Sequence, residues 1–511
     1  MRRRNLFAGF VCLGLVGMAA LLAALPADVQ ATHLCPNTGS SAGAYDFVAY
    51  EAASLTNIYA RTMELGAFNQ LFPDVASFRP ADIEGGPRSL GSDTKFAPRV
   101  TPGLLKAIGW IESSWNQATY SVPEGSVGAA LISHDCGYGI MQITSGMQNT
   151  IGIPTIDHAM IGGSFAFNIG RGVQILIDKW NYAPEVRPII GDRNSNILED
   201  YYYAVWGYNG FAFKNHPLNP QYPAWPRVPY SCGPLNDGLG HDRSQYPYQE
   251  LVLGCLAHPP VASGAALWPA QAVHLPELSD PAIAERLSAA NWQACSVNYN
   301  CAAMDLPRPN PSNIDATALT VDRGQVLGFP TPFASPGTLS LSALQLTQSS
   351  SVPVAIGNSG TGALAWRLST TAPWIRLSRV QGVSVGSDLG SIPLSVSVWA
   401  DAQNLPARIH KGDIIVESLY ATQNYYTIPV QLEVKAEQFS GDFDCDADVD
   451  ILDALTLLQE VVGLEMPPDC TFVGDVDCSG TVDILDVLAL LKFTIGIPVN
   501  LPPGCPPIGG A

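Results

Sequence analysis

The sequence predicts a protein of several domains: a mainly α-helical domain, an all-β sandwich and a small α-helical tail. The chain has 511 residues and is 47% hydrophobic, enough for more than one core. Helical apolar spacing dominates the part up to residue 305, and short alternating runs follow from Leu339 to Lys435. An internal repeat begins at Gly441. We therefore expect three differently built parts.

Residues 1–31 are typical of a secretory signal peptide. Three arginines precede an apolar run, and Val29-Gln30-Ala31 is a small-x-small cleavage pattern. A retained membrane anchor is the alternative, since the apolar run is close to spanning length. We expect a secreted protein, extracellular or at the cell surface, that has no membrane attachment after cleavage.

Charge and cysteine content narrow the function classes. Asp and Glu number 45 against 26 Lys and Arg, a net charge of −19. Such an acidic surface argues against a nucleic-acid partner. One of the eleven cysteines, Cys12, lies in the leader, and the even number that remains predicts disulfides in an exported chain.

Composition also predicts the domain boundaries. The helical domain is expected over residues 32–305. Residues 306–336 are rich in proline and serine without periodicity, which predicts a linker. Turn residues separate the runs of the sandwich over 337–436, and the repeat occupies 437–511.

The tail carries a clear ligand pattern. GDFDCDADVDILDALTLLQEVVGL and GDVDCSGTVDILDVLALLKFTIGI align without gaps, and oxygen-bearing residues recur at loop positions 1, 3, 5, 7, 9 and 12. These are Asp442, Asp444, Asp446, Asp448, Asp450 and Asp453 in the first copy and Asp475, Asp477, Ser479, Thr481, Asp483 and Asp486 in the second. Hard oxygen ligands at this spacing predict two structural calcium sites, with position 7 contributing its carbonyl. An acidic solvated loop is the alternative.

Both copies resemble the type I dockerin, a pair of calcium loop-helix units. The resemblance implies docking to a cohesin-like scaffold module, whereas a purely structural terminus is the alternative. Ala447 stands where the loop usually has glycine. Equivalent cysteines suggest one disulfide per repeat, Cys445 with Cys470 and Cys478 with Cys505, although spacing alone leaves the connectivity open.

The β region is similar to immunoglobulin-like modules of the BACON type through GTGALAWRLSTTAPWIRLS and YTIPVQLEV. The similarity implies a sandwich of two sheets. Trp366 and Trp374 are expected to fill its core, and a sugar-binding platform is the alternative.

The segment LLKAIGWIESSWNQ raises the central question about function. Apolar residues recur at helical spacing from Leu104 to Trp115, and Thr101-Pro102 predicts the helix start. Glu112 lies on this apolar helix near its end. Because burial disfavours a carboxylate, we expect a raised pKa, which suits a general acid that cleaves a glycosidic bond. A surface or paired glutamate is the alternative.

Three later segments, SHDCGYGIMQIT, FNIGRGVQILIDKW and YYYAVWGYNG, follow in an order that resembles the lysozyme-like lytic transglycosylases of the SLT type. The resemblance implies a lysozyme-like domain with Glu112 as its catalytic residue. It also implies substrate contacts from Ser133, Met141, Gln142, Tyr208 and Asn209. Core packing is an equal alternative for Met141, and a helix cap for Asn209.

The chain departs from this family in its cysteines and in an extension after Gly210. Cys136 replaces a common glycine, and Cys35 is its expected partner. Within the extension we expect two further disulfides, Cys232 with Cys255 and Cys295 with Cys301.

The resemblance implies a peptidoglycan lytic transglycosylase that cleaves the β-1,4 bond between N-acetylmuramic acid and N-acetylglucosamine and forms a 1,6-anhydro ring. No cofactor is expected for catalysis. A hydrolytic lysozyme or a chitin-type glycosidase is the first alternative, with Asp135 as a candidate second carboxylate. A non-catalytic protein that binds such a glycan and is displayed through the tail is the second.

Overall fold

The computed structural model describes residues 43–53, 57–88, 94–149, 151–182, 187–233, 242–435, 440–444, 448–464 and 474–509. The expected signal peptide lies outside these residues. Within the described part of the chain, no helix is both long and apolar enough to cross a bilayer.

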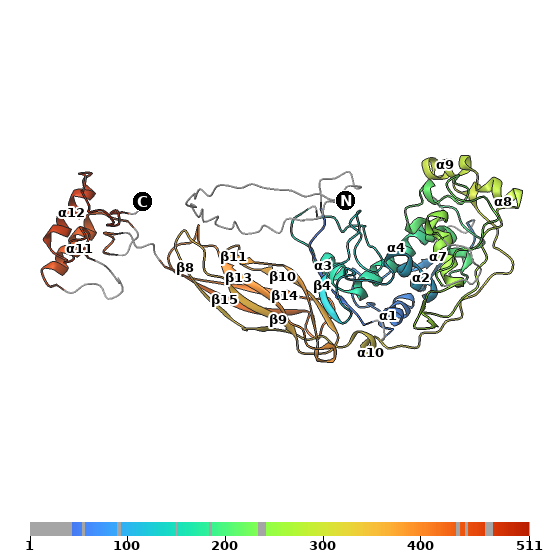
Figure 1. The fold of residues 1–511 in the computed structure, drawn as a ribbon, viewed down its shortest axis with the longest axis horizontal. Coiled ribbons are helices and arrows are strands. Elements are labelled where there is room, and N and C mark those ends of the chain that lie inside the picture. Colours follow the sequence, from blue (N-terminus) through green and yellow to red (C-terminus); the bar gives the residue numbers. More distant parts are fainter. Residues whose placement is uncertain are drawn as a thin grey trace, which may run out of the picture.

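The expected fold class is wrong. The structure is mixed, with about 29% helix and 21% strand, rather than a mainly α lysozyme-like domain followed by a separate immunoglobulin-like sandwich. The first part, where Figure 1 shows strand β4 beside helix α3, already contains three two-stranded antiparallel sheets. They pair β1 (Val48–Glu51) with β4 (Ser126–Ala129), β2 (Ile83–Glu84) with β3 (Lys95–Phe96), and β5 (Val261–Ala262) with β6 (Ala265–Ala266).

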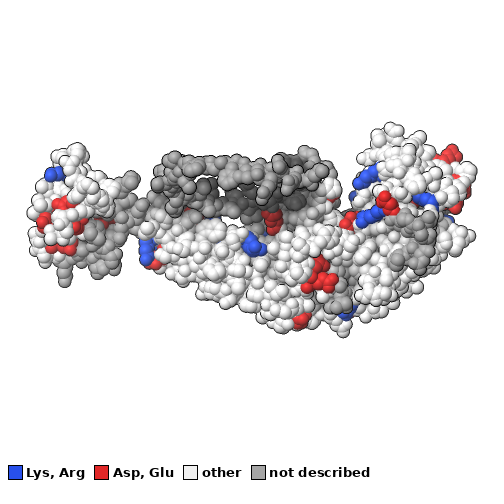
Figure 2. All heavy atoms as spheres, viewed as in Figure 1, with Lys and Arg blue, Asp and Glu red and all other residues white. Residues whose placement is uncertain are grey.

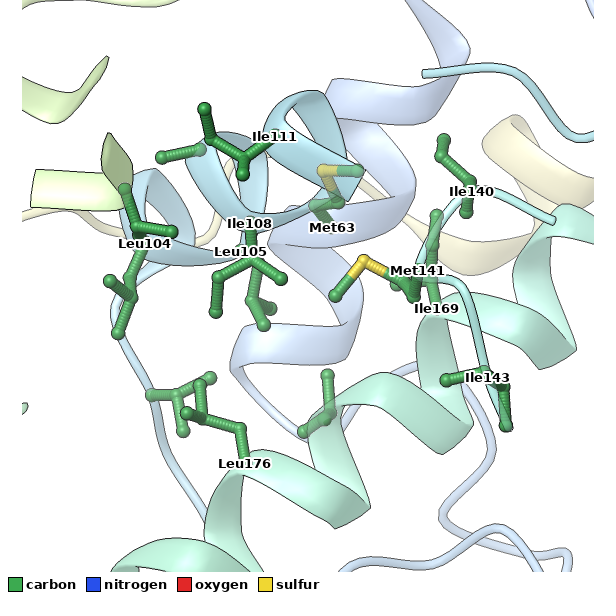
Figure 3. Close-up of a cluster of buried hydrophobic side chains, with 14 of the residues drawn as sticks. Met63, Leu104, Leu105, Ile108, Ile111, Ile140, Met141, Ile143, Ile169 and Leu176 are labelled. Carbon is green, nitrogen blue, oxygen red and sulfur yellow. The ribbon is translucent and has the colours of Figure 1, made fainter. Parts of the chain in front are cut away.

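Helices supply buried residues to the interior of the first part, except for the short helix Pro281–Arg286, which has none. They are α1 (Ile58–Ala67), α2 (Pro102–Ser113), α3 (Ile156–Gly163), α4 (Phe165–Asn181), α6 (Tyr202–Tyr208), α7 (Tyr248–Ala257), α8 (Pro281–Arg286) and α9 (Ala289–Asn298). Figure 3 shows side chains from α1, α2 and α4 meeting around Met141, which comes from a turn rather than a helix. Apolar residues at three- and four-residue steps, such as Leu104, Ile108 and Ile111, supply this shared core.

Nine strands form two larger sheets. One has the order β12-β10-β14-β15-β8 and the other β11-β13-β9-β7. Their bounds are β7 (Pro332–Ser335), β8 (Leu339–Leu344), β9 (Val352–Asn358), β10 (Ala363–Thr370), β11 (Ile375–Leu377), β12 (Gln381–Val385), β13 (Leu394–Ala400), β14 (Ile409–Glu417) and β15 (Tyr425–Lys435). Alternate residues of β15 are buried, as a half-exposed strand requires. Trp366 and Trp374 are buried with them.

The sheets and the helical part share a core, which is the physical reason for the wrong fold class. Ala365, Val383 and Val385 belong to the buried cluster of the helical part rather than to that of the sheets. The Gln381 amide donates to the Val48 carbonyl and accepts from the Val48 amide, both at 2.9 Å. Strand β12 is therefore buried along its whole length. Local alternation could not predict this because the second buried face packs against residues far away in sequence.

Residues 306–336, predicted as a linker, run along the helical part. The Leu306 amide donates to the Ile189 carbonyl at 2.9 Å, and the Asn313 amide donates to Glu199 Oε2 at 2.9 Å. Asp315 is buried. The segment then forms the short helix α10 (Arg323–Leu327) and leads into β7.

The tail consists of two helices with a small core of their own. These are α11 (Ile451–Val461) and α12 (Ile484–Thr494), each begun by an aspartate capping box. Phe443, Leu457 and Leu490 lie at the centre of that core.

Three expected disulfides are confirmed: Cys232–Cys255, Cys295–Cys301 and Cys478–Cys505. Cys136 is disulfide-bonded as well. Its expected partner Cys35, and the expected pair of Cys445 with Cys470, fall outside the described residues.

Candidate active site

Glu112 lies in the last turn of α2, and its side chain remains partly exposed. The helix stops at Ser113, because Ser114 takes the left-handed conformation with φ 54°. The Ser113 hydroxyl donates to the Ile140 carbonyl at 2.9 Å and so joins the helix end to the following turn. At the other end of the helix, Pro102 is the first residue as predicted, but the Thr101 hydroxyl caps no backbone amide.

The surroundings of Glu112 hold the pKa of its carboxyl near 7. The Tyr248 hydroxyl donates a short hydrogen bond to Glu112 Oε1. Burial is the largest influence and raises the pKa of Glu112 to about 7, while the Tyr248 hydrogen bond opposes this rise. The charge of Arg243 also lowers the pKa, and the charge of Asp135 raises it. At neutral pH the group can therefore both give and take a proton.

The Gly-Ile-Met-Gln turn beside the helix end is built around a buried glutamine. Gly139 has φ +64°, and a Cβ at this position would lie 2.3 Å from Gln117 Oε1. That oxygen accepts from the Ile140 amide at 3.1 Å, while the Gln117 amide nitrogen donates to the Gly162 carbonyl at 3.0 Å. Only glycine fits this combination of conformation and contact.

Met141 and Tyr208 connect the turn with helices α4 and α6. Met141 is fully buried, and the structure places it in the core rather than on a cleft wall. Its amide donates to Asn168 Oδ1 at 2.8 Å, and its carbonyl accepts from the Tyr208 hydroxyl at 3.0 Å. Burial, and then the charge of Glu112, raise the pKa of Tyr208, so its phenol remains a protonated donor close to the acid.

Ser133 and Gln142 come together, and Asn209 lies apart from them. A Cβ on Gly137 would meet Ser133 Oγ at 2.8 Å and Gln142 Oε1 at 3.1 Å, so both side chains converge there. Ser133 Oγ also donates to Asp135 Oδ1 at 2.5 Å. Asn209 follows the end of α6, and its Oδ1 accepts from the Asn215 side-chain amide at 2.9 Å. This bond organises the chain after the helix.

Sequence reasoning missed Tyr248, Arg243 and Lys214, three residues of the extension whose side chains act on Glu112. One signal could have found Tyr248. It precedes Cys255 by two helical turns, so the two share a face of α7, and the predicted Cys232–Cys255 disulfide indicates which face is buried.

The tail brings together most of the predicted calcium ligands. Carboxylate oxygens lie within 4.8 Å of one another in three groups. They are Asp442 with Asp444 and Asp453, Asp448 with Asp450 and Asp453, and Asp475 with Asp477 and Asp486. Figure 2 shows acidic side chains gathered on the visible face of this part. Asp446 falls outside the described residues.

The second loop shows how well the donor set fits a hard cation. Amides of Ser479 and Gly480 each donate to the Asp475 carboxylate at 2.7 Å and wrap the loop around it. Gly480 has φ +90°, which favours glycine at this position. Ser479 Oγ donates to the Thr481 carbonyl at 3.2 Å, and Asp483 caps α12 through the Leu485 amide. Oxygen-only groups of closely spaced carboxylates match the preference of calcium.

Comparisons with known proteins add no family. No family model and no curated protein matches the chain. Among solved structures, a xyloglucanase of glycoside hydrolase family 5 from Bacteroides ovatus is 15% identical, with a TM-score of 0.16, and covers 24% of this chain and 21% of its own. A PapD-like domain of human CEP192 is 12% identical, with a TM-score of 0.17 over 21% of this chain and 87% of its own. A family 123 glycoside hydrolase from Clostridium perfringens is 13% identical, with a TM-score of 0.15 over 21% of this chain and 24% of its own. Similarities this low carry no argument about function.

Proposed function

We propose that the chain is a lytic transglycosylase that cleaves the β-1,4 bond between N-acetylmuramic acid and N-acetylglucosamine in peptidoglycan. The observation that carries the proposal is the partly exposed Glu112 carboxyl, held by Tyr248 with a pKa of about 7. The sequence resemblance to this enzyme class supplies the substrate.

One residue would act twice. Protonated Glu112 gives its proton to the glycosidic oxygen, the bond to the anomeric carbon breaks, and the neighbouring N-acetyl group stabilises the positive charge. The glutamate, now a carboxylate, takes the proton of the muramic 6-hydroxyl as that oxygen attacks the anomeric carbon. The ring closes and Glu112 regains its proton, so no water is consumed.

The charges around Glu112 suit both halves of this cycle. Burial favours the neutral acid that must donate first. Tyr248 and Arg243 favour the carboxylate that forms after donation and that must accept the second proton. Burial outweighs these opposing influences, and because the resulting pKa is about 7, both forms are populated at neutral pH.

A hydrolase acting on the same bond is the second candidate, and Asp135 favours it. The charge of Asp135 acts on Glu112, so the two carboxyl groups belong to one electrostatic environment. Asp135 also accepts from Ser133, which orients it. An inverting or retaining hydrolase needs such a second carboxylate.

Mass spectrometry of soluble products from purified peptidoglycan would test the proposal. We expect anhydro-muropeptides from the wild-type protein and from Glu124→Gln, an exposed acid that serves as the matched control, and none from Glu112→Gln. Reducing ends that disappear in Asp135→Asn would favour the hydrolase. Binding of peptidoglycan without any product would favour a non-catalytic glycan-binding protein.

For the tail we propose two structural calcium ions and docking to a cohesin-like module outside the cell or at its surface. Exposed apolar residues recur at equivalent places on the two helices, such as Leu452 and Leu485, with 50% and 54% of their surface exposed, and they would suit a protein partner. Calcium titration calorimetry on the full chain should give two sites in the wild type and one in Asp486→Asn. A heat signal identical in both proteins would contradict the ligand assignment.

A further inference from the structure

An apolar cavity lies where the helical part meets the large sheets, and none of its lining residues belongs to the Glu112 site. Its volume is about 370 Å³. The walls come from α1, the start of α4, α10 and the sheet loops, and α10 lies beside α1 in Figure 1. Its apolar lining includes Ile58, Phe72, Phe165, Phe167, Leu327 and Leu389. This size and composition are those of a site for a small molecule, at the lower end of the usual range.

The lining carries the Arg61 guanidinium and the Tyr50 hydroxyl, two hydrogen-bond donors whose side chains are not engaged by another described residue. Burial, and then the charges of Asp388 and Glu51, raise the pKa of Tyr50, so its phenol stays protonated and able to donate. An acceptor supplied by a ligand would pair both donors, and a charged acceptor would form the stronger hydrogen bonds.

Two other polar side chains of the lining, Asp388 and Tyr420, are already engaged. The Asp388 carboxylate accepts from the Gly362 amide at 2.9 and 3.1 Å. The Tyr420 hydroxyl donates to the Gly328 carbonyl at 2.8 Å. The cavity therefore offers a mainly apolar lining to which Arg61 and Tyr50 add hydrogen-bond donors.

We propose that this cavity binds a small monoanionic amphiphile, with its apolar body against the phenylalanines and its carboxylate on Arg61 and Tyr50. A guanidinium fork matches the two oxygens of a carboxylate. The negative charge of Asp388, which also acts on Tyr50, repels a doubly charged head such as phosphate more strongly than a carboxylate. This inference does not depend on the glycosidase activity.

Calorimetry with dodecanoate and dodecanol, below their aggregation limits, would test the site. We expect the full chain to bind dodecanoate about tenfold more tightly than dodecanol, because only the carboxylate forms charged hydrogen bonds. Arg61→Gln should remove this tenfold preference and leave dodecanol binding unchanged. Ala363→Leu, which fills part of the cavity, should weaken both ligands.

Arg376→Gln is the matched control, because this arginine lies at the surface and pairs with Asp401. It should bind both ligands as the wild type does, and unchanged melting temperatures would show that each variant is folded. Equal dodecanoate affinity in wild type and Arg61→Gln, or no binding at all, would overturn the proposal. Tighter binding of dodecyl phosphate than of dodecanoate would overturn the assignment of a monoanionic head.

Discussion

The hydrogen bond from Tyr248 to Glu112 leads to a measurable shift in pH dependence. In Tyr248→Phe the carboxylate form of Glu112 loses a donor, so the pKa should rise above its value of about 7. Hydrogen bonds to charged groups contribute about 1.5–3 kcal/mol, and 1.36 kcal/mol corresponds to about one pKa unit. Because Glu112 is partly exposed, we take the lower end and expect an increase of about one unit.

The assay is kcat/KM for soluble peptidoglycan fragments as a function of pH. If Glu112 must be protonated to start the reaction, activity falls as pH rises through its pKa, and this alkaline limb should move from near pH 7 to about pH 8 in Tyr248→Phe. Tyr203→Phe is the control, because this buried hydroxyl donates to the Met304 carbonyl instead. A limb that stays in place or moves to lower pH would refute the assigned role of Tyr248.

Three further outcomes are expected. Folded Glu112 keeps its proton between its ordinary pKa of 4.5 and about 7 while the unfolded chain loses it, so this group lowers stability as pH rises through that window. The stability of Glu112→Gln relative to wild type should therefore be greater at pH 8 than at pH 4, by at most about 3 kcal/mol before solvent screening. Urea unfolding at the two pH values measures this, and an equal difference at both would contradict it. Gly139→Ala should lower the melting temperature by several degrees and reduce activity, because the new Cβ meets Gln117; an unchanged melting curve would refute the contact. A chelator should lower the unfolding temperature of the tail, with calcium at about 100 times its Kd restoring about 2.7 kcal/mol, and scanning calorimetry would show whether it does.

Local patterns predicted local structure well and long-range packing poorly. The helix that carries Glu112 begins at Pro102 as expected, since its apolar spacing and proline are visible within a dozen residues or so. Cys232 and Cys255 were paired correctly because they are consecutive cysteines of the extension, only 23 positions apart. By contrast, Tyr248 reaches Glu112 across 136 positions. Neither periodicity nor spacing contains that information.

The predicted fold class was wrong for the same reason. Strand β12 is buried throughout, because Gln381 and Val383 turn toward the helical part. Glutamine in a strand usually indicates exposure. Here its amide is satisfied by the backbone of Val48, so a polar residue could be buried at little cost.

The core that helices and sheets share also determines which parts of this protein can be removed or exchanged, in evolution or by engineering. Cutting the chain at residue 336 would remove Ala365, Val383 and Val385 from the core of the helical part and expose the apolar surface that they cover. Among the described residues, the tail has a core of its own around Phe443 that contains no residue of the helical part or of the large sheets. We therefore expect that the tail can be exchanged between proteins by recombination, whereas the helical part and the large sheets must be kept together.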